Sequence, residues 1–288
     1  MIHEVLSPFP FEAFITFRAQ FEIELPKLER AGSHLFYSVE GDGRPPIVFL
    51  HPLPFDHRIW MHQTFEFSFA HRVLALDFPG LGYSEASIRP CTILSLSDDL
   101  NDIMKIEGIE EAVVVGLSLG GAVAQQFALK YPEKVRKLIL AGTSCTYAGD
   151  EIRKKFTERV SQYESPAASE HYTNNLKILF SSKFLESEQG NSILRNYSSL
   201  GARIDFKGVA KLFGALLSFD IEEKIGSIGA PTLVIAGDED RVFSDSKKIS
   251  EKIPNAKFFP IQGAGHIACY EKPKLFNTAI KHFLESDS

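Results

Sequence analysis

The stretch Gly116-Leu117-Ser118-Leu119-Gly120 carries the strongest signal of fold in this sequence. It follows an apolar run at residues 112–115 and precedes an alanine-rich, helix-prone stretch at residues 122–130. A Gly-x-Ser-x-Gly between a strand and a helix is typical of a nucleophile elbow, a tight turn that holds its serine in a strained conformation at a sheet edge. The glycines are needed because a Cβ atom there would collide with the neighbouring strand and helix. The pattern predicts that Ser118 is a nucleophile.

Short apolar runs recur along the chain and predict the sheet to which this turn belongs. They are apolar throughout rather than alternating, which is typical of parallel strands covered on both faces by helices. Helix-prone stretches alternate with them at residues 97–107, 122–130 and 273–285, and the first is expected to begin with an N-cap at Ser97. The alternation predicts an α/β fold with a mostly parallel central sheet and helices on both faces. The runs lie at residues 47–50, 73–76, 112–115, 138–141, 233–236 and 257–260.

One long segment between the fourth and fifth predicted strands has no strand-like run. Helix-like patterns at residues 150–163, 167–180 and 203–219, punctuated by Pro166, Gly190 and Gly201, indicate a helical insertion there. Residues 1–27 are Phe-rich and form an N-terminal extension, either a short extra strand or an arm that packs on the body. The predicted division is a core of residues 1–145 and 227–288 and an inserted helical unit of residues 146–226.

Composition and charge exclude several classes of protein. The formal net charge of −6 argues against a nucleic-acid binder, which would show a basic stripe. No stretch approaches the roughly 18 apolar residues that span a bilayer, which argues against a membrane protein. The N-terminus is broken by Pro8 and Pro10 and has no basic opening, so it does not resemble a signal peptide. The three cysteines lack Cys-x-x-Cys spacing, which fits a reducing compartment, and we expect a cytoplasmic protein.

The chain offers a general base for the predicted nucleophile. A serine hydroxyl needs a base, usually a histidine, and a carboxylate that fixes the imidazole tautomer. With this elbow the expected chain order is serine, acid, histidine. Of the histidines that follow Ser118, His171 lies in the helical insertion and His282 in the terminal helix, whereas His266 lies in a glycine-rich loop. Because glycines let such a loop reach across the sheet edge, we predict that His266 is the base.

The acid is expected on a loop that follows a strand between the serine and the histidine. The turn after the fifth predicted strand contains three consecutive carboxylates, Asp238, Glu239 and Asp240. Adjacent positions in one turn are equally near the histidine in sequence, so spacing alone selects none of the three.

Taken together, these motifs resemble the α/β-hydrolase superfamily, in its branch of esterases, enol-lactonases and haloperoxidase-like enzymes with a helical cap. The resemblance runs from about residue 28 to 285, apart from the insertion. The set of motifs in this order is highly specific, whereas any one of them alone is not. The motifs are Phe-Leu-His-Pro-Leu at residues 49–53, Asp-Phe-Pro-Gly-Leu-Gly-Tyr-Ser at 77–84, the glycine-rich turn at 116–121, the segment 230–240 and Gly-His at 265–266.

The resemblance implies a site. The nucleophile would be Ser118, the base His266, and the acid Asp240, because the family's acid comes three residues after the glycine that ends the strand. The oxyanion hole would use the backbone N–H groups of Leu119 and Leu53. The resemblance implies no metal, no organic cofactor and a small-molecule substrate.

The chain departs from the family at one point. The family usually has His-Gly at the start of the loop after residue 50, and this chain has His51-Pro52. Proline has no N–H, so Pro52 cannot donate a hydrogen bond and Leu53 is the next candidate. The insertion resembles the family's cap, whose apolar residues, here including Tyr163, roof the pocket and would suit a small ester, lactone or similar acyl compound.

The leading hypothesis is therefore a serine hydrolase that acts on a small ester, lactone or related acyl substrate through an acyl-enzyme. Hydrolases of C–C bonds in meta-cleavage products and aminopeptidases share the layout and stay open as alternatives. Dehalogenases and epoxide hydrolases are disfavoured because they have aspartate in place of Ser118. A dinucleotide-binding oxidoreductase is disfavoured because the turn is not Gly-x-Gly-x-x-Gly. A non-catalytic ligand receptor on this fold is the alternative of another class.

Other polar residues are interpreted as structural. We expect His51 to support the end of a strand, Asp77 to be a turn carboxylate, and His57 and His62 to be surface or packing residues. The three histidines do not have a zinc-site spacing, and the sequence contains no His-Glu-x-x-His.

Overall fold

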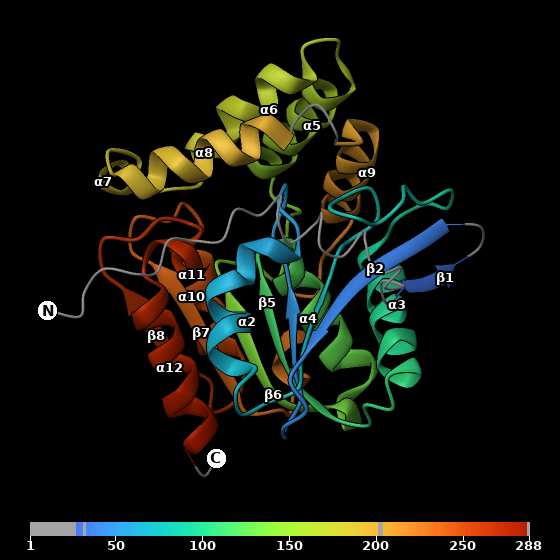
Figure 1. The fold of residues 1–288 in the computed structure, drawn as a ribbon, viewed down its shortest axis with the longest axis vertical. Helices are drawn as coiled ribbons and strands as arrows, with labels where there is room; N and C mark the ends of the chain where they lie inside the picture. The colour runs from blue at the N-terminus through green and yellow to red at the C-terminus, as the bar shows by residue number, and fades with distance from the viewer. Residues whose placement is uncertain (1–26, 31–32, 201–203, 287–288) are drawn as a thin grey trace, which may run out of the picture.

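The structure, a computed structural model, describes residues 27–30, 33–200 and 204–286, and its centre is a twisted sheet (Figure 1). The strands are β1 (Lys27–Arg30), β2 (Ser33–Glu40), β3 (Ile47–Leu50), β4 (Val73–Leu76), β5 (Ala112–Leu117), β6 (Val135–Ala141), β7 (Thr232–Gly237) and β8 (Lys257–Ile261). They form one eight-stranded sheet in the order β1-β2-β4-β3-β5-β6-β7-β8. From β4 to β8 the pairs are parallel, whereas β2 is antiparallel to both β1 and β4.

The parallel strands at the centre form the core. Every residue of β3, β4, β5 and β7 is buried, as expected of strands covered on both faces. The helix α2 packs on α12, and α3 packs on α4. The predicted mostly parallel sheet with flanking helices is confirmed. The flanking helices are α2 (Met61–Phe67), α3 (Ile93–Ile106), α4 (Leu119–Lys130), α10 (Phe243–Lys252), α11 (Ala268–Glu271) and α12 (Pro273–Glu285), with a short 3-10 helix η1 (His57–Trp60) before α2.

The predicted start of α3 is wrong. The helix begins four residues before Ser97, because Thr92 and Ser95 form a capping box. The Ser95 N–H donates to Thr92 Oγ1 at 3.0 Å, and the Thr92 N–H donates to Ser95 Oγ at 3.0 Å. This reciprocal pair satisfies backbone donors that a helix start otherwise leaves unpaired. Ser97 instead lies inside the helix, where its hydroxyl donates to Leu94 O at 2.7 Å.

A helical region is inserted between β6 and β7, as predicted. We call α5 to α9 the helical insertion; α5, α6 and α8 lie above the sheet in Figure 1. Two of its helices, α7 and α8, were not predicted, and Gly190 lies in the first turn of α8 instead of ending a helix. Residue 203, the expected start of α9, lies outside the described residues. The helices are α5 (Asp150–Glu164), α6 (Ala168–Lys177), α7 (Ser182–Leu185), α8 (Glu188–Leu200) and α9 (Phe206–Leu217).

The expected N-terminal extension, residues 1–27, falls outside the described residues except for Lys27, which is the first residue of β1. Lys27 pairs with Phe36 across the antiparallel β1–β2 ladder. Among the described residues, no helix is both long and apolar enough to cross a membrane.

Candidate active site

The turn that contains Ser118 joins β5 to α4 and has the backbone expected of an elbow. Ser118 has φ 55° and ψ −112°, a conformation that is rare for a residue with a side chain and costs on the order of 1–3 kcal/mol. The Ser118 N–H donates to Ala141 O at 3.0 Å, which ties the turn to the end of β6. The serine side chain lies at the carboxyl end of the central strand, where it is only partly buried.

The glycines of the turn are explained by close packing. A Cβ atom at Gly116 would lie 2.2 Å from Gly120 O, and one at Gly120 would lie 2.1 Å from Leu50 O. A Cβ atom at Gly121 would lie 2.6 Å from the Cβ atom of Thr143. All three distances are shorter than real contacts allow, so the start of α4 sits directly against the ends of β3 and β6 only because these residues are glycines.

The predicted acid and base lie in contact. His266 Nδ1 is 2.9 Å from Asp240 Oδ2, and the two side chains are 11% and 2% exposed. The other oxygen of Asp240 accepts a hydrogen bond from the Val242 N–H at 3.1 Å, which fixes the carboxylate. Gly142, at the end of β6, has φ +47°, and a Cβ atom there would lie 2.9 Å from Asp240 Oδ2.

The geometry separates the three candidate carboxylates. Asp238 and Glu239 are exposed, whereas Asp240 is buried. Asp238 Oδ1 accepts a hydrogen bond from the Gly263 N–H at 2.7 Å and thereby braces the loop that precedes the histidine. Of the other two histidines downstream, His171 lies on α6 and His282 is exposed on α12.

The two predicted oxyanion donors lie on segments that meet at the elbow. Leu119 is the first residue of α4, where backbone N–H groups have no acceptor within the helix. Leu53 lies in the turn after β3, which is closed by a hydrogen bond of 3.0 Å from the Phe55 N–H to Pro52 O. The peptide bond that follows Leu53 is cis. The close approach of Gly120 to Leu50 brings the start of α4 against the strand that leads into this turn.

Comparison with known proteins agrees with this fold. Residues 45–273 match the sequence family described as alpha/beta hydrolase fold. This chain belongs to the alpha/beta hydrolase fold family. The resemblance inferred from its motifs is thereby confirmed.

Several relatives of this alpha/beta hydrolase are enzymes. A 3-oxoadipate enol-lactonase from Acinetobacter baylyi is 27% identical over 260 residues, which cover 89% of this chain and 95% of the enzyme. The crystal structure of a hydrolase from Pseudomonas aeruginosa PA01 has a TM-score of 0.84 and 27% identity, covering 92% of this chain and all of that one. The enol-lactonase from Burkholderia xenovorans LB400 has a TM-score of 0.83 and 25% identity, covering 91% and 100%.

In this alpha/beta hydrolase, His51 braces two loops beside the elbow. The Phe78 N–H donates to His51 Nε2 at 2.9 Å, so that nitrogen carries no proton. The other nitrogen, Nδ1, is 3.0 Å from Pro52 O and donates to it. Complete burial lowers the pKa of His51, against a smaller opposing effect from Asp77. His51 is therefore a neutral residue that joins the loops after β3 and β4, and it is unsuited to proton transfer.

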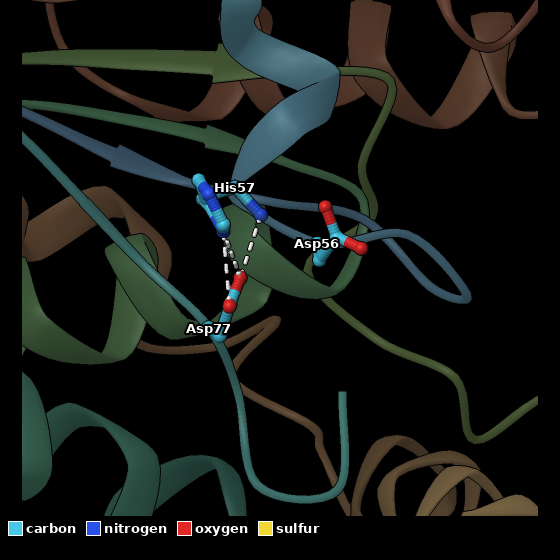
Figure 2. Close-up of side chains that lie close together, drawn as sticks. All are labelled: Asp56, His57 and Asp77. Carbon is cyan, nitrogen blue, oxygen red and sulfur yellow. Dashed lines mark hydrogen bonds and ion pairs between the residues drawn. The ribbon is translucent and has the colours of Figure 1, made fainter. Parts of the chain in front are cut away.

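A second polar cluster lies beside these loops (Figure 2). His57 Nδ1 lies 2.8 and 2.9 Å from the two oxygens of Asp77, and the His57 N–H donates to Asp77 Oδ1 at 2.7 Å. The Tyr83 N–H donates to Asp77 Oδ2 at 2.9 Å. Asp56 accepts from the Arg58 N–H at 3.0 Å and from Arg58 Nε at 2.7 Å, and its second oxygen pairs with Arg58 Nη2.

This cluster is better explained as a brace than as a metal site. Asp56, His57 and Asp77 are close enough to hold an ion, but N–H donors already engage both carboxylates. Burial lowers the pKa of His57, yet the charge and hydrogen bond of Asp77 outweigh this effect and raise it overall. Burial also raises the pKa of Asp56, but Arg58 outweighs that effect and lowers it. The His57–Asp77 contact could not be predicted from the sequence, because no local spacing links the two residues.

Proposed function

We propose that this chain is a serine hydrolase that cleaves a small ester, lactone or related acyl substrate through Ser118, His266 and Asp240. The observation that carries the proposal is the 2.9 Å contact between His266 Nδ1 and Asp240 Oδ2, at the same end of the sheet as the strained turn of Ser118. The enol-lactonase relatives support the substrate class.

The chemistry begins at the histidine. Because Asp240 accepts a hydrogen bond from Nδ1–H, it holds His266 in the tautomer whose Nε2 has a free lone pair. Nε2 takes the hydroxyl proton of Ser118 while the serine Oγ forms a bond to the substrate carbonyl carbon. The carbonyl π electrons move onto oxygen, and the N–H groups of Leu53 and Leu119 would stabilise that oxyanion.

The reaction then passes through an acyl-enzyme. As the tetrahedral intermediate collapses, the bond to the leaving oxygen breaks and the leaving group takes the proton from His266 Nε2. Water, deprotonated by the same nitrogen, attacks the acyl carbon, and Ser118 leaves with the proton. The mechanism uses no metal or organic cofactor. In this proposal residues 146–226 act as a cap over the substrate, on a core of residues 1–145 and 227–288.

The test is the hydrolysis of p-nitrophenyl acetate and butyrate, followed by a panel of lactones and enol-lactones. We expect Ser118→Ala to lower kcat by at least about 1000-fold. Ser227→Ala is the matched control. It also removes a serine hydroxyl, but from an exposed residue at the end of a 3-10 helix, where the hydroxyl donates only to Lys224 O. Unchanged activity in Ser118→Ala would overturn the proposal.

Two further assays separate the alternatives. A fluorophosphonate probe labels a nucleophilic serine, so a wild-type protein that stays unlabelled would be a ligand receptor without turnover. Faster cleavage of aminoacyl p-nitroanilides than of esters and lactones would instead indicate an aminopeptidase.

A further inference from the structure

The loop of His266 is held by the helical insertion on both sides of the histidine. The residue after it, Ile267, donates its backbone N–H to Leu179 O at 3.2 Å. The residue before it, Gly265, donates its N–H to Glu271 Oε1 at 3.0 Å. Leu179 lies in the segment that joins α6 to α7, so one of these hydrogen bonds links the loop directly to the insertion.

The carboxylate of Glu271 makes the second link. Ser181, which lies in the same segment of the insertion, donates its hydroxyl to Glu271 Oε2 at 2.5 Å. The Ser181 N–H lies 3.3 Å from Oε1 and 3.2 Å from Oε2 of the same carboxylate. Glu271 therefore joins Gly265 in the loop to Ser181 in the insertion, although 90 residues separate Glu271 from Ser181 in sequence.

The two backbones also touch at this point. A Cβ atom at Gly265 would lie 2.6 Å from Ser181 N and 2.8 Å from the carbonyl carbon of Phe180. Only a glycine leaves room for the insertion to come this close to the residue beside the histidine.

The hydrogen bonds of Glu271 to Ser181 in the insertion and to Gly265 in the loop depend on each other, because they share one buried carboxylate. Glu271 is 7% exposed and Ser181 is 3% exposed, so water has little access to the carboxylate while the insertion is in place. Burial raises the pKa of the Glu271 carboxyl, and the donors from Ser181 and Gly265 act against that rise. Losing the donors of the insertion would leave a buried carboxylate poorly solvated and would weaken its hold on the loop.

We propose that Glu271 is a positioning residue that couples the seating of the helical insertion to the placement of His266. When α6 and α7 are seated, Ser181 and Leu179 hold the residues on either side of the histidine. When they are not, the loop loses both links and the base leaves its position. The catalytic consequence rests on the proposed function, but the coupling itself does not.

The first test measures the coupling without any substrate. Amide hydrogen exchange of the peptide that spans residues 262–270 is compared in the wild type, Ser181→Ala and Glu271→Gln. Both variants should exchange faster at Gly265 and Ile267, by about 10-fold or more. Ser187→Ala is the matched control. The Ser187 hydroxyl accepts from the Gly190 N–H at 3.0 Å, as the Ser181 hydroxyl accepts from the Phe184 N–H at 3.3 Å, but only Ser181 donates to Glu271. Unchanged exchange in Ser181→Ala would overturn the proposal.

The second test measures the consequence at the nucleophile. The rate constant for fluorophosphonate labelling of Ser118 should fall roughly 10- to 100-fold in Glu271→Gln, at temperatures where circular dichroism shows a folded protein. The double variant Ser181→Ala/Glu271→Gln should label no more slowly than Glu271→Gln alone, because both substitutions disrupt the same hydrogen bond between Ser181 and Glu271.

The outcomes distinguish the two proposals. A wild type that neither labels nor hydrolyses esters overturns the serine hydrolase. A wild type that labels, with variants that label equally fast and only unfold at lower temperature, overturns the positioning role of Glu271.

Discussion

His266 Nδ1 lies 2.9 Å from Asp240 Oδ2, and this one contact joins two loops that follow adjacent strands, β7 and β8. Each loop presents its side chain at the carboxyl end of the sheet. Because parallel strands all end at the same edge, loops distant in sequence meet there, which is why α/β proteins bind ligands at this edge.

Replacing the acid should abolish most activity. In Asp240→Asn the amide oxygen would accept the Val242 N–H, and the amide NH2 would then donate to His266 Nδ1. This holds the imidazole in the wrong tautomer, so kcat for p-nitrophenyl acetate should fall by about 10³- to 10⁴-fold. Asp238→Asn is the control, because Asp238 is an exposed neighbour that touches Gly263 and not the histidine. We expect the control to stay within a few-fold of wild type. An active Asp240→Asn would contradict the assignment of the acid.

Gly142→Ala should damage both stability and activity. The new methyl group would approach Asp240 Oδ2 to 2.9 Å and His266 Nδ1 to 3.2 Å, at a backbone φ of +47° that disfavours alanine. We expect a loss on the order of 1–3 kcal/mol in the free energy of unfolding. We also expect a lower kcat in the folded enzyme. Gly229→Ala, with nothing within 4 Å of the added atom, should leave both quantities near wild type.

Tyr172→Phe and Tyr197→Phe should not destabilise the protein. Among the described residues, neither buried hydroxyl has a hydrogen-bond partner. Removing such a group relieves a desolvation cost, so the free energy of unfolding should stay constant or rise by about 1 kcal/mol. Tyr37→Phe should instead lower it by about 1 kcal/mol, because the Tyr37 hydroxyl donates to Glu107 Oε1 at 2.6 Å. Urea denaturation measures the free energy of unfolding of all three variants. A clear decrease in Tyr172→Phe or Tyr197→Phe would contradict the expectation.

The contact between His57 and Asp77 should make stability depend on pH. The folded-state pKa of His57 is raised above its ordinary value of 6.5, so the protonated ring stabilises the folded state. This contribution is complete below the unfolded-state pKa and is lost as pH rises through the folded-state pKa. His57→Gln should therefore reduce the free energy of unfolding more at about pH 5.5 than at about pH 9. An equal reduction at both pH values would contradict this.

Local patterns were sufficient to predict the six parallel strands and the turn at Ser118, but not the antiparallel strands β1 and β2. Strands buried on both faces, such as β3 and β5, are apolar at every position, and that property can be read without knowing their partners. The glycines around Ser118 pack closely against residues of the same turn or against the ends of the neighbouring strands β3 and β6. The order of the motifs along the chain then indicated the resemblance to the α/β-hydrolase superfamily.

The remaining features depend on contacts that sequence spacing does not encode. Which of Asp238, Glu239 and Asp240 contacts the histidine depends on the direction in which each side chain points from the same turn. Spacing does not encode that direction, and the resemblance to the family selected Asp240. The helix α8 was missed because Gly190 was taken as a break, although its N–H is held by Ser187 in the first turn. No pattern in the sequence linked Glu271 to the insertion.

The close packing at Gly116, Gly120 and Gly121 shows that the glycines of the elbow motif report on architecture, whereas its serine reports on chemistry. These glycines are set by the approach of α4 to β3 and β6, and they would be required even if the serine between them were lost. A descendant of this protein that drifts into a binding role would therefore keep its glycines long after its chemistry. Glycine spacing in a distant relative thus indicates shared architecture, whereas the serine, aspartate and histidine must each be present before turnover is expected.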